Sequence, residues 1–64
     1  MKIIYRDQEW ELRAGMTTRD AIQKVGMNLE EVLAVRNGKL INEETILEPD
    51  DEVTLIAVIS GGML

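Results

Sequence analysis

Residues 53–60 of the chain read Val-Thr-Leu-Ile-Ala-Val-Ile-Ser, and Gly61 and Gly62 follow them directly. Six of these eight residues are apolar, several are β-branched and none is charged. Such a run is typical of a strand in the middle of a sheet that is buried on both faces. Since glycine makes up roughly 7% of an average protein, an adjacent pair at this point is uncommon and indicates either a frayed chain end or a functional tail.

The residues before this stretch predict four further strands. Residues 2–6 and 9–14 alternate between apolar and polar side chains, which favours a hairpin with one solvated face. Tyr5 and Trp10, the two aromatic residues, are expected in the core rather than on a ligand-binding surface. Residues 32–36 and 39–41 flank Asn37-Gly38, a dipeptide that predicts a tight hairpin because both turn positions require positive φ.

One helix is predicted between the two hairpins. Thr17 stands three residues before Asp20, a spacing at which both side chains can cap free N–H groups of a helix start. Small and apolar side chains then recur at helical spacing, at Thr18, Ala21, Ile22 and Val25. Gly26 stands where a left-handed cap residue is needed, so the helix has about eight residues and depends on packing against the sheet.

Two polar segments join the remaining elements. Residues 28–31 are expected to form a short turn in which Asn28 is a cap. Residues 42–52 contain six acids and no base, with Ile46 and Leu47 as apolar anchors. The acids lack the alternating Asp/Asn pattern and central glycine of a calcium loop, so we interpret them as turn formers and solvated side chains.

Composition excludes several classes of function. A chain of 64 residues forms one small domain, and the absence of cysteine and histidine removes disulfides, the usual zinc and copper sites and His-assisted nucleophiles. We therefore expect no catalytic residue and no bound metal. The net charge of -5 argues against nucleic acid as a partner and leaves another protein as the expected one.

The hydrophobic pattern predicts the cellular compartment of the protein. The longest apolar run is far shorter than the roughly 20 residues that cross a bilayer, and residues 1–20 contain no apolar stretch typical of an export signal. The sequence thus predicts a cytoplasmic protein with no membrane partner.

The order of elements predicts the fold. Two hairpins flank one helix, and the most apolar strand comes last, so it should lie centrally and parallel to the first strand. We predict an α+β fold of the β-grasp (ubiquitin-like) class, with a five-stranded mixed sheet and one helix packed across one face. Residues 1–60 form the domain and residues 61–64 form a C-terminal tail.

The sequence resembles a known family over nearly its whole length. The matching motifs are Gly15-Met16-Thr17, Val35-Arg36-Asn37-Gly38-Lys39-Leu40, Asp51-Glu52-Val53 and Val58-Ile59-Ser60-Gly61-Gly62. On these residues the chain resembles the small ubiquitin-like sulfur carriers typified by ThiS and MoaD. The short helix and the absence of insertions are more similar to ThiS than to the larger MoaD.

This resemblance implies a substrate-like carrier rather than an enzyme. In the family, an E1-like enzyme uses ATP to adenylate the carboxylate of the last glycine, and a sulfur donor then converts it to a thiocarboxylate for an acceptor synthase. The reactive residue here would be Gly62, with Gly61 beside it and no cofactor bound to the carrier itself. Similar carriers serve the thiazole of thiamine, molybdopterin, thiolated tRNA and cysteine-type synthesis.

The chain departs from the family pattern in two places. Pro49-Asp50-Asp51 replaces the glycine that commonly precedes the Asp before the last strand, which we expect to alter the turn and not the chemistry. Met63 and Leu64 follow Gly62, whose carboxyl group is therefore held in a peptide bond. We expect a processing protease to cut between Gly62 and Met63.

Two other functions share this pattern. A ubiquitin-like modifier would use the same activated glycine to form isopeptide bonds with lysines of target proteins. A plain β-grasp interaction module would carry a glycine pair without chemical use.

A partner-binding patch is predicted on the sheet face away from the helix. Alternation along the strands places four aliphatic residues there, namely Ile4, Val35, Ile56 and Val58. We expect them to bind the activating enzyme, because exposed aliphatic side chains on one face of so acidic a protein favour a partner. Scattered surface apolar residues are the alternative interpretation.

Overall fold

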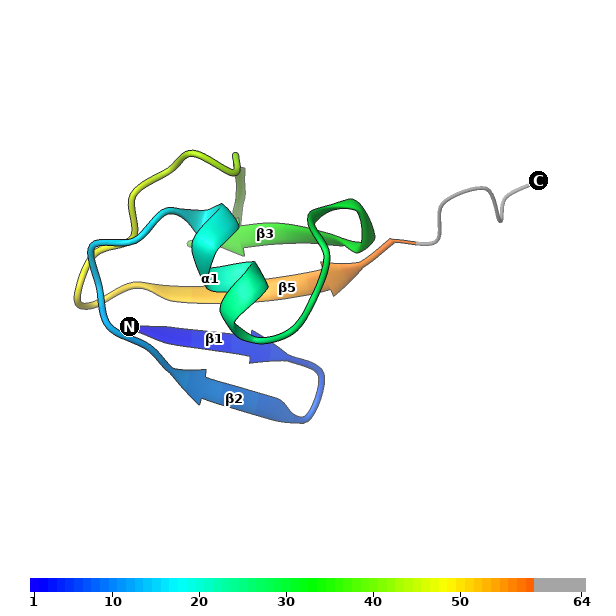
Figure 1. The fold of residues 1–64 in the computed structure, drawn as a ribbon, viewed down its shortest axis with the longest axis horizontal. Helices are drawn as coiled ribbons and strands as arrows, with labels where there is room; N and C mark the ends of the chain where they lie inside the picture. Colours follow the sequence, from blue (N-terminus) through cyan, green and yellow to red (C-terminus); the bar gives the residue numbers. More distant parts are fainter. Residues whose placement is uncertain (59–64) are drawn as a thin grey trace.

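A computed structural model describes residues 1–58 as a single sheet crossed by one helix (Figure 1). The strands are β1 (Lys2–Tyr5), β2 (Gln8–Glu11), β3 (Val32–Arg36), β4 (Lys39–Ile41) and β5 (Glu52–Ala57); α1 spans Thr18–Lys24 and the short 3₁₀ helix η1 spans Leu29–Glu31. The sheet order is β2-β1-β5-β3-β4, with β5 parallel to β1 and every other pair antiparallel. The predicted five-stranded mixed sheet with a central, parallel last strand is confirmed.

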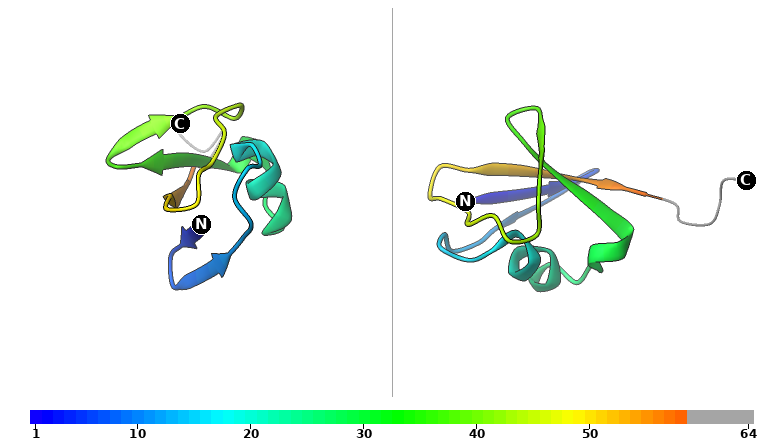
Figure 2. Two further views of the ribbon diagram at one scale, coloured as in Figure 1. Left: turned by 90° about the vertical axis from the view of Figure 1, so that its left-hand side faces the viewer. Right: turned by 90° about the horizontal axis from the view of Figure 1, so that it is seen from above.

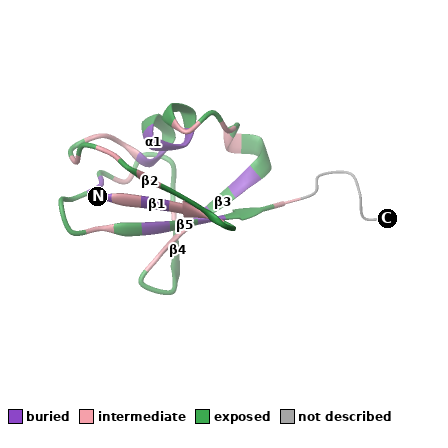
Figure 3. Cartoon of the chain, turned by 90° about the horizontal axis from the view of Figure 1, so that it is seen from below, coloured by how far each residue is buried: buried purple, intermediate pink, exposed green. Residues whose placement is uncertain are grey.

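The core lies between α1 and one face of the sheet, as Figure 2 shows from two sides. Its buried members come from the helix, the strands and one loop, namely Met1, Ile3, Ala21, Ile22, Val32, Ala34, Leu47, Val53 and Leu55. Figure 3 shows buried segments on α1, β1, β3 and β5, whereas β4 and the connecting loops are mostly exposed or intermediate. Tyr5 and Trp10 are half-buried and pack against this core, as expected for core residues.

Burial of β5 corrects one prediction. Val53 and Leu55 are buried, but Glu52, Thr54 and Ile56 are exposed, so the strand is central in the sheet and buried on one face only. The prediction of burial on both faces is wrong because α1 covers one face, and within residues 1–58 no second layer covers the other. The aliphatic side chain of Ile56 therefore points to solvent.

Both ends of α1 are formed by local signals. The Asp20 N–H donates to the Thr17 hydroxyl at 3.2 Å, which confirms Thr17 as the N-cap, although no reciprocal bond to the Asp20 carboxylate occurs in residues 1–58. Gly26 has φ +86, and the N–H groups of Gly26 and Met27 donate to the carbonyls of Gln23 and Ile22. This pair of bonds is the Schellman motif, so the helix ends at Lys24, one residue before the predicted end.

We expect Thr17→Ala to lower the free energy of unfolding by about 1 kcal/mol, because the substitution removes the side-chain acceptor for the Asp20 N–H. Thr17→Ser keeps a hydroxyl at the same position and is expected to remain near the parent. Urea unfolding of the three proteins measures the difference. Equal midpoints for the Ala and Ser variants would show that the cap contributes nothing.

The segments after α1 contain both expected and unexpected features. Asn37 and Gly38 both have positive φ, at 56° and 79°, which confirms the predicted turn. Asn28 is the N-cap residue of η1, as the sequence suggested, but its side chain makes no capping hydrogen bond. Leu47 is fully buried as predicted, whereas Ile46 is 54% exposed, because adjacent residues of this extended segment point in opposite directions.

Candidate functional site

The sheet face away from α1 carries a contiguous apolar surface, which we call the open-face patch. Its members are Ile4 of β1, Leu33 and Val35 of β3, Leu40 of β4 and Ile56 of β5. Leu33 lies opposite Ile56, and Val35 lies opposite both Leu40 and Thr54. Ile4 lies across Thr54 on the other side of β5, so the aliphatic side chains surround that threonine.

The exposed fractions set this face apart from the core. Leu33, Leu40 and Ile56 are 43%, 65% and 48% exposed, while Ile4 and Val35 are half-buried. Directly opposed side chains on a sheet lie about 5 Å apart, so these residues form one surface rather than scattered contacts. A surface of this kind on a small acidic protein is suited to burial by a partner.

Three of the four predicted patch residues share this face, and the fourth lies just beyond the strand. Val58 follows the last residue of β5, is half-buried, and donates its N–H to the Glu31 carbonyl at 2.8 Å. The role of the patch stays a prediction.

Sequence reasoning missed Leu33 and Leu40, which both belong to the patch. The two-residue turn at Asn37-Gly38 sets the register of the hairpin and places Leu40 opposite Val35. Alternation from Val35 places Leu33 on the same face. Both signals were available in the sequence.

The rest of the open face is charged. Lys2 lies between Glu9 and Glu52, with Nζ to carboxylate distances of 3.6 Å and 3.8 Å. Exposed ion pairs of this geometry add little stability. Glu9 of β2, Lys2 of β1 and Glu52 of β5 thus form a charged cluster on the open face beside the apolar patch.

The chain leaves the sheet beside this patch. Ile56 of the patch is followed by Ala57, the last residue of β5, and by Val58, the last described residue. Gly61 and Gly62 lie outside the described residues, as do residues 59–60 of the predicted domain and the whole predicted tail over 61–64. Their roles therefore stay predictions from the sequence.

The described part of the chain contains neither a cluster of metal ligands nor a membrane-spanning helix. No group of three or more acidic residues in residues 1–58 is arranged to hold a metal ion. Neither helix of this part is long and apolar enough to cross a membrane.

Comparison with known proteins identifies the family. The model of the ThiS family matches residues 1–62, so the match spans all five strands and ends at the second glycine of the pair. The chain belongs to the ThiS family. A similar protein is the sulfur carrier protein TtuB of Thermus thermophilus, with 29% identity over 65 residues that cover 97% of this chain and 100% of that protein.

Membership of the ThiS family agrees with the predicted class of molecule. Proteins of this family are small, substrate-like carriers rather than catalysts, which agrees with the prediction that the chain is not an enzyme. The sheet with one crossing helix is likewise the ubiquitin-like fold expected for a ThiS family member.

Pro49, where the chain departs from the ThiS family pattern, lies in a tight turn. The Asp51 N–H donates to the Glu48 carbonyl at 3.0 Å, which closes a four-residue turn with Pro49 at its second position, where proline is favoured. The Asp51 carboxylate accepts from the Glu48 N–H and from Arg36 Nη1, both at 2.8 Å. The turn therefore fixes the start of β5, at the opposite end of the strand from the tail (Figure 1).

These contacts change the acidity of Asp51. The hydrogen bond from the Glu48 N–H lowers the pKa of the Asp51 carboxyl most, partial burial opposes this effect, and the Arg36 guanidinium lowers the pKa further. The net pKa is below the ordinary value. A carboxyl group with a depressed pKa stabilises the fold above its unfolded pKa of about 3.9, and this contribution is lost as pH falls through the folded pKa.

We therefore expect Asp51→Asn to be less stable than the parent at pH 7, because asparagine cannot carry the charge that Arg36 contacts. Below pH about 4 the two stabilities are expected to converge as Asp51 of the parent becomes protonated. Urea unfolding of both proteins across this pH range measures the difference, and other acids cancel because they titrate in both. A stability gap that stays constant down to pH about 2 would contradict the assignment.

Proposed function

We propose that this chain is a sulfur carrier that works through the carboxyl group of Gly62. Removal of Met63 and Leu64 frees the carboxylate, and an E1-like enzyme adenylates it with ATP. A sulfur donor then converts it to a thiocarboxylate, which an acceptor synthase uses in cofactor synthesis or tRNA thiolation. The observation that carries this proposal is the ThiS family match, which includes Gly61 and ends at Gly62.

The chemistry requires a free carboxylate at this position. A carboxylate oxygen attacks the α-phosphate of ATP and pyrophosphate leaves, which gives an acyl-adenylate. Sulfide (HS⁻) from the donor then attacks the carbonyl carbon, AMP leaves with the electron pair of the broken C–O bond, and the thioacid loses its proton to give the thiocarboxylate. Glycine suits this role because a tail without Cβ atoms enters a narrow channel and adopts backbone angles that other residues avoid.

The open-face patch is the proposed docking surface for the activating enzyme. Ile56 of the patch lies on β5, the strand that precedes Gly61 and Gly62 in the sequence, so binding at the patch brings the end of β5 close to the partner. Aliphatic side chains that are half exposed in the free protein and gathered on one face form a patch of the kind that a partner protein buries. Their position on a hydrogen-bonded sheet reduces the entropy lost on binding.

Intact mass spectrometry of the protein from its native host tests the proposal. We expect a species that ends at Gly62, together with a second in which one oxygen atom is replaced by sulfur. Lysine-linked adducts on other proteins in place of the sulfur species would identify a modifier. A population that consists of the uncut chain alone would overturn the proposal.

A further inference from the structure

The outer edge of β3 is only partly paired. β4 pairs with Ala34, Val35 and Arg36, and the ladder does not extend to Val32 at the start of β3. Because the Glu31 carbonyl accepts from Val58 N–H, Glu31 and Leu33 direct their backbone groups toward β5. Val32 therefore directs its N–H and C=O away from β5, toward the side that β4 has left.

Neither backbone group of Val32 has a turn or loop partner among residues 1–58. Val32 is only 4% exposed, and buried backbone polar groups in proteins are nearly always hydrogen-bonded. The edge at Val32 is thus a position where an added strand would supply a partner, foremost for the Val32 carbonyl, because the N–H directly follows the last turn of η1. We call this part of β3 the notch.

The chain after β4 is held away from the notch by several hydrogen bonds. Asn42 Oδ1 accepts from the Glu44 N–H at 2.9 Å and from the Thr45 hydroxyl at 3.2 Å. The Glu43 carbonyl accepts from the Arg19 N–H at 2.9 Å, which ties this segment to the first turn of α1. The segment is therefore fixed elsewhere and does not fill the notch itself.

A cavity of about 320 Å³ lies between the notch and α1. It has apolar and polar lining residues. The apolar ones are Ile22, Leu29, Val32, Leu33, Ala34 and Ile41, and the polar ones are Thr18, Asn42 and Glu43. A second hollow, formed by Gln23, Met27, Asn28 and Glu30, meets the first at Leu29. Together they form a groove along α1, and Leu33 at its edge belongs to the open-face patch as well.

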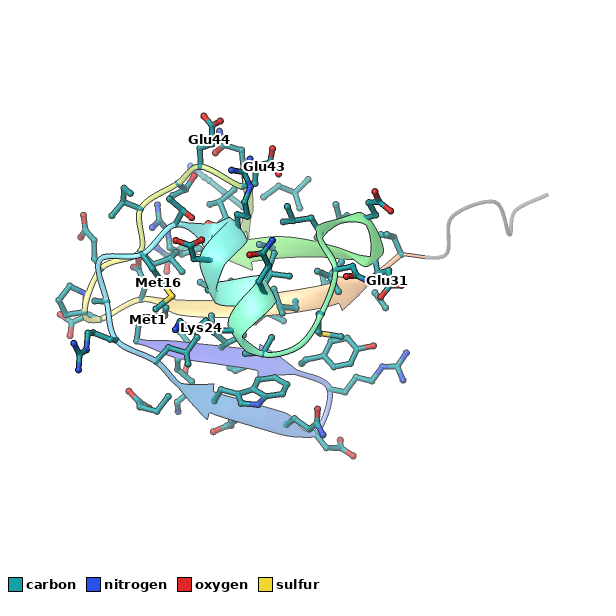
Figure 4. All side chains as sticks on the ribbon, in the orientation of Figure 1. Met1, Met16, Lys24, Glu31, Glu43 and Glu44 are labelled. Carbon is teal, nitrogen blue, oxygen red and sulfur yellow. The ribbon has the colours of Figure 1, made fainter. Side chains whose placement is uncertain are left out.

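The surroundings of this groove are acidic. Glu30, Glu31, Glu43 and Glu44 are exposed, and Figure 4 shows Glu43 and Glu44 together beyond β4 and Glu31 near the C-terminal end of β5. Within residues 1–58, the ion pair of Glu43 with Arg19 at 3.1 Å is the one salt bridge that these four carboxylates make. The groove thus combines an apolar floor, a free strand edge and excess negative charge.

We propose that the notch binds an extended peptide segment of a partner protein, with an aliphatic residue flanked by lysine or arginine. The backbone of the peptide pairs with Val32, its aliphatic side chain enters the cavity, and its cations face the surrounding carboxylates. This is strand addition at a sheet edge, in which backbone bonds give affinity and side-chain pockets give specificity. The notch and the open-face patch meet at β3, where Leu33 directly follows Val32, so a peptide in the notch lies next to the patch.

The test is an NMR titration of the ¹⁵N-labelled full chain with acetyl-Lys-Val-Leu-Val-Lys-amide. We expect saturable shifts of the Ile22, Leu29 and Val32 amides and slower hydrogen exchange at Val32. The matched peptide acetyl-Glu-Val-Leu-Val-Glu-amide should bind about tenfold or more weakly, because its charges repel the carboxylates. Equal affinity of the two peptides would overturn the charge assignment and with it the proposal.

Two variants locate the binding site. Leu29→Lys should weaken binding of the lysine peptide by about tenfold or more, whereas the matched change Leu40→Lys on the open-face patch should leave it unchanged. If Leu29→Lys is unfolded by its amide spectrum, the exposed double change Glu30→Lys and Glu31→Lys supplies the same comparison. Shifts confined to Leu40 and Ile56, or no saturable shift up to about 5 mM peptide, would overturn the proposal. Adenylation at Gly62 is measured separately by pyrophosphate release. Failure of peptide binding at the notch can therefore be distinguished from failure of the proposed carrier function.

Discussion

A chain that ends at Gly62 is expected to release pyrophosphate when mixed with ATP and its activating enzyme, and a chain that retains Met63 and Leu64 is expected to release none above background. The difference should be all or none, because the amide that joins Gly62 to Met63 has no carboxylate oxygen to attack the α-phosphate. Two residues add only about 7 Å to an extended chain, too little to form a new element. The loss of pyrophosphate release would therefore result from the missing carboxylate at Gly62 and not from a change of fold.

Two controls make this comparison decisive. The longer protein must be verified as uncut by intact mass after the incubation, since trace proteolysis would imitate activity. A chain that ends at Gly61 should also be inactive, because the carboxylate is then displaced by one residue of about 3.5 Å. Equal pyrophosphate release from the verified uncut chain and the chain ending at Gly62 would mean that Gly62 is not the activated residue.

The second large effect is expected at the open-face patch. Ile56→Asp should reduce affinity for the activating enzyme by about 30-fold or more, the loss that defines a binding hot spot. Ile56 is 48% exposed and lies opposite Leu33, so the substitution places a charge in the apolar half of the face. The fold should tolerate the change at a cost of about 1 kcal/mol, because the buried side chains of β5 are Val53 and Leu55.

Ile46→Asp is the matched control for this experiment. Ile46 is 54% exposed, similar to Ile56, but it lies in the loop before β5 and outside the open-face patch. Isothermal titration with the activating enzyme compares both variants with the parent, and urea unfolding verifies that each is folded. Equal affinities for the two variants would show that the enzyme docks elsewhere.

The fold was predictable because several local signals agree. Asn37-Gly38 determines one hairpin, Thr17 and Gly26 mark the ends of α1, and an apolar last strand requires a central position. Each signal depends on residues near one another in the chain, and the topology rules then leave few arrangements. The parallel pairing of β1 with β5 followed from these rules and not from any local motif.

The errors in predicted burial have one shared origin. Hydrophobicity shows that a side chain favours burial but not whether the chain itself or a partner covers it, so Ile56 was assigned both to a doubly buried strand and to a docking face. The same ambiguity made Ile46 look equivalent to Leu47. The notch of β3 could not be predicted for a different reason, because the course of the chain after β4 depends on the tertiary bond between Glu43 and Arg19 as well as on the local turn at Asn42.

The position of β5 in the sequence also determines when the protein can fold during synthesis. The β1–β2 and β3–β4 hairpins are each translated early, but they join in the sheet only through residues 52–57. An isolated hairpin is marginal in water, so a nascent or truncated chain that lacks these residues has no sheet to stabilise it. The patch shares this dependence, since Ile56 contributes to it and Leu33 and Ile4 meet only across β5. An enzyme that docks on the open face therefore selects finished molecules and leaves translation fragments for proteases.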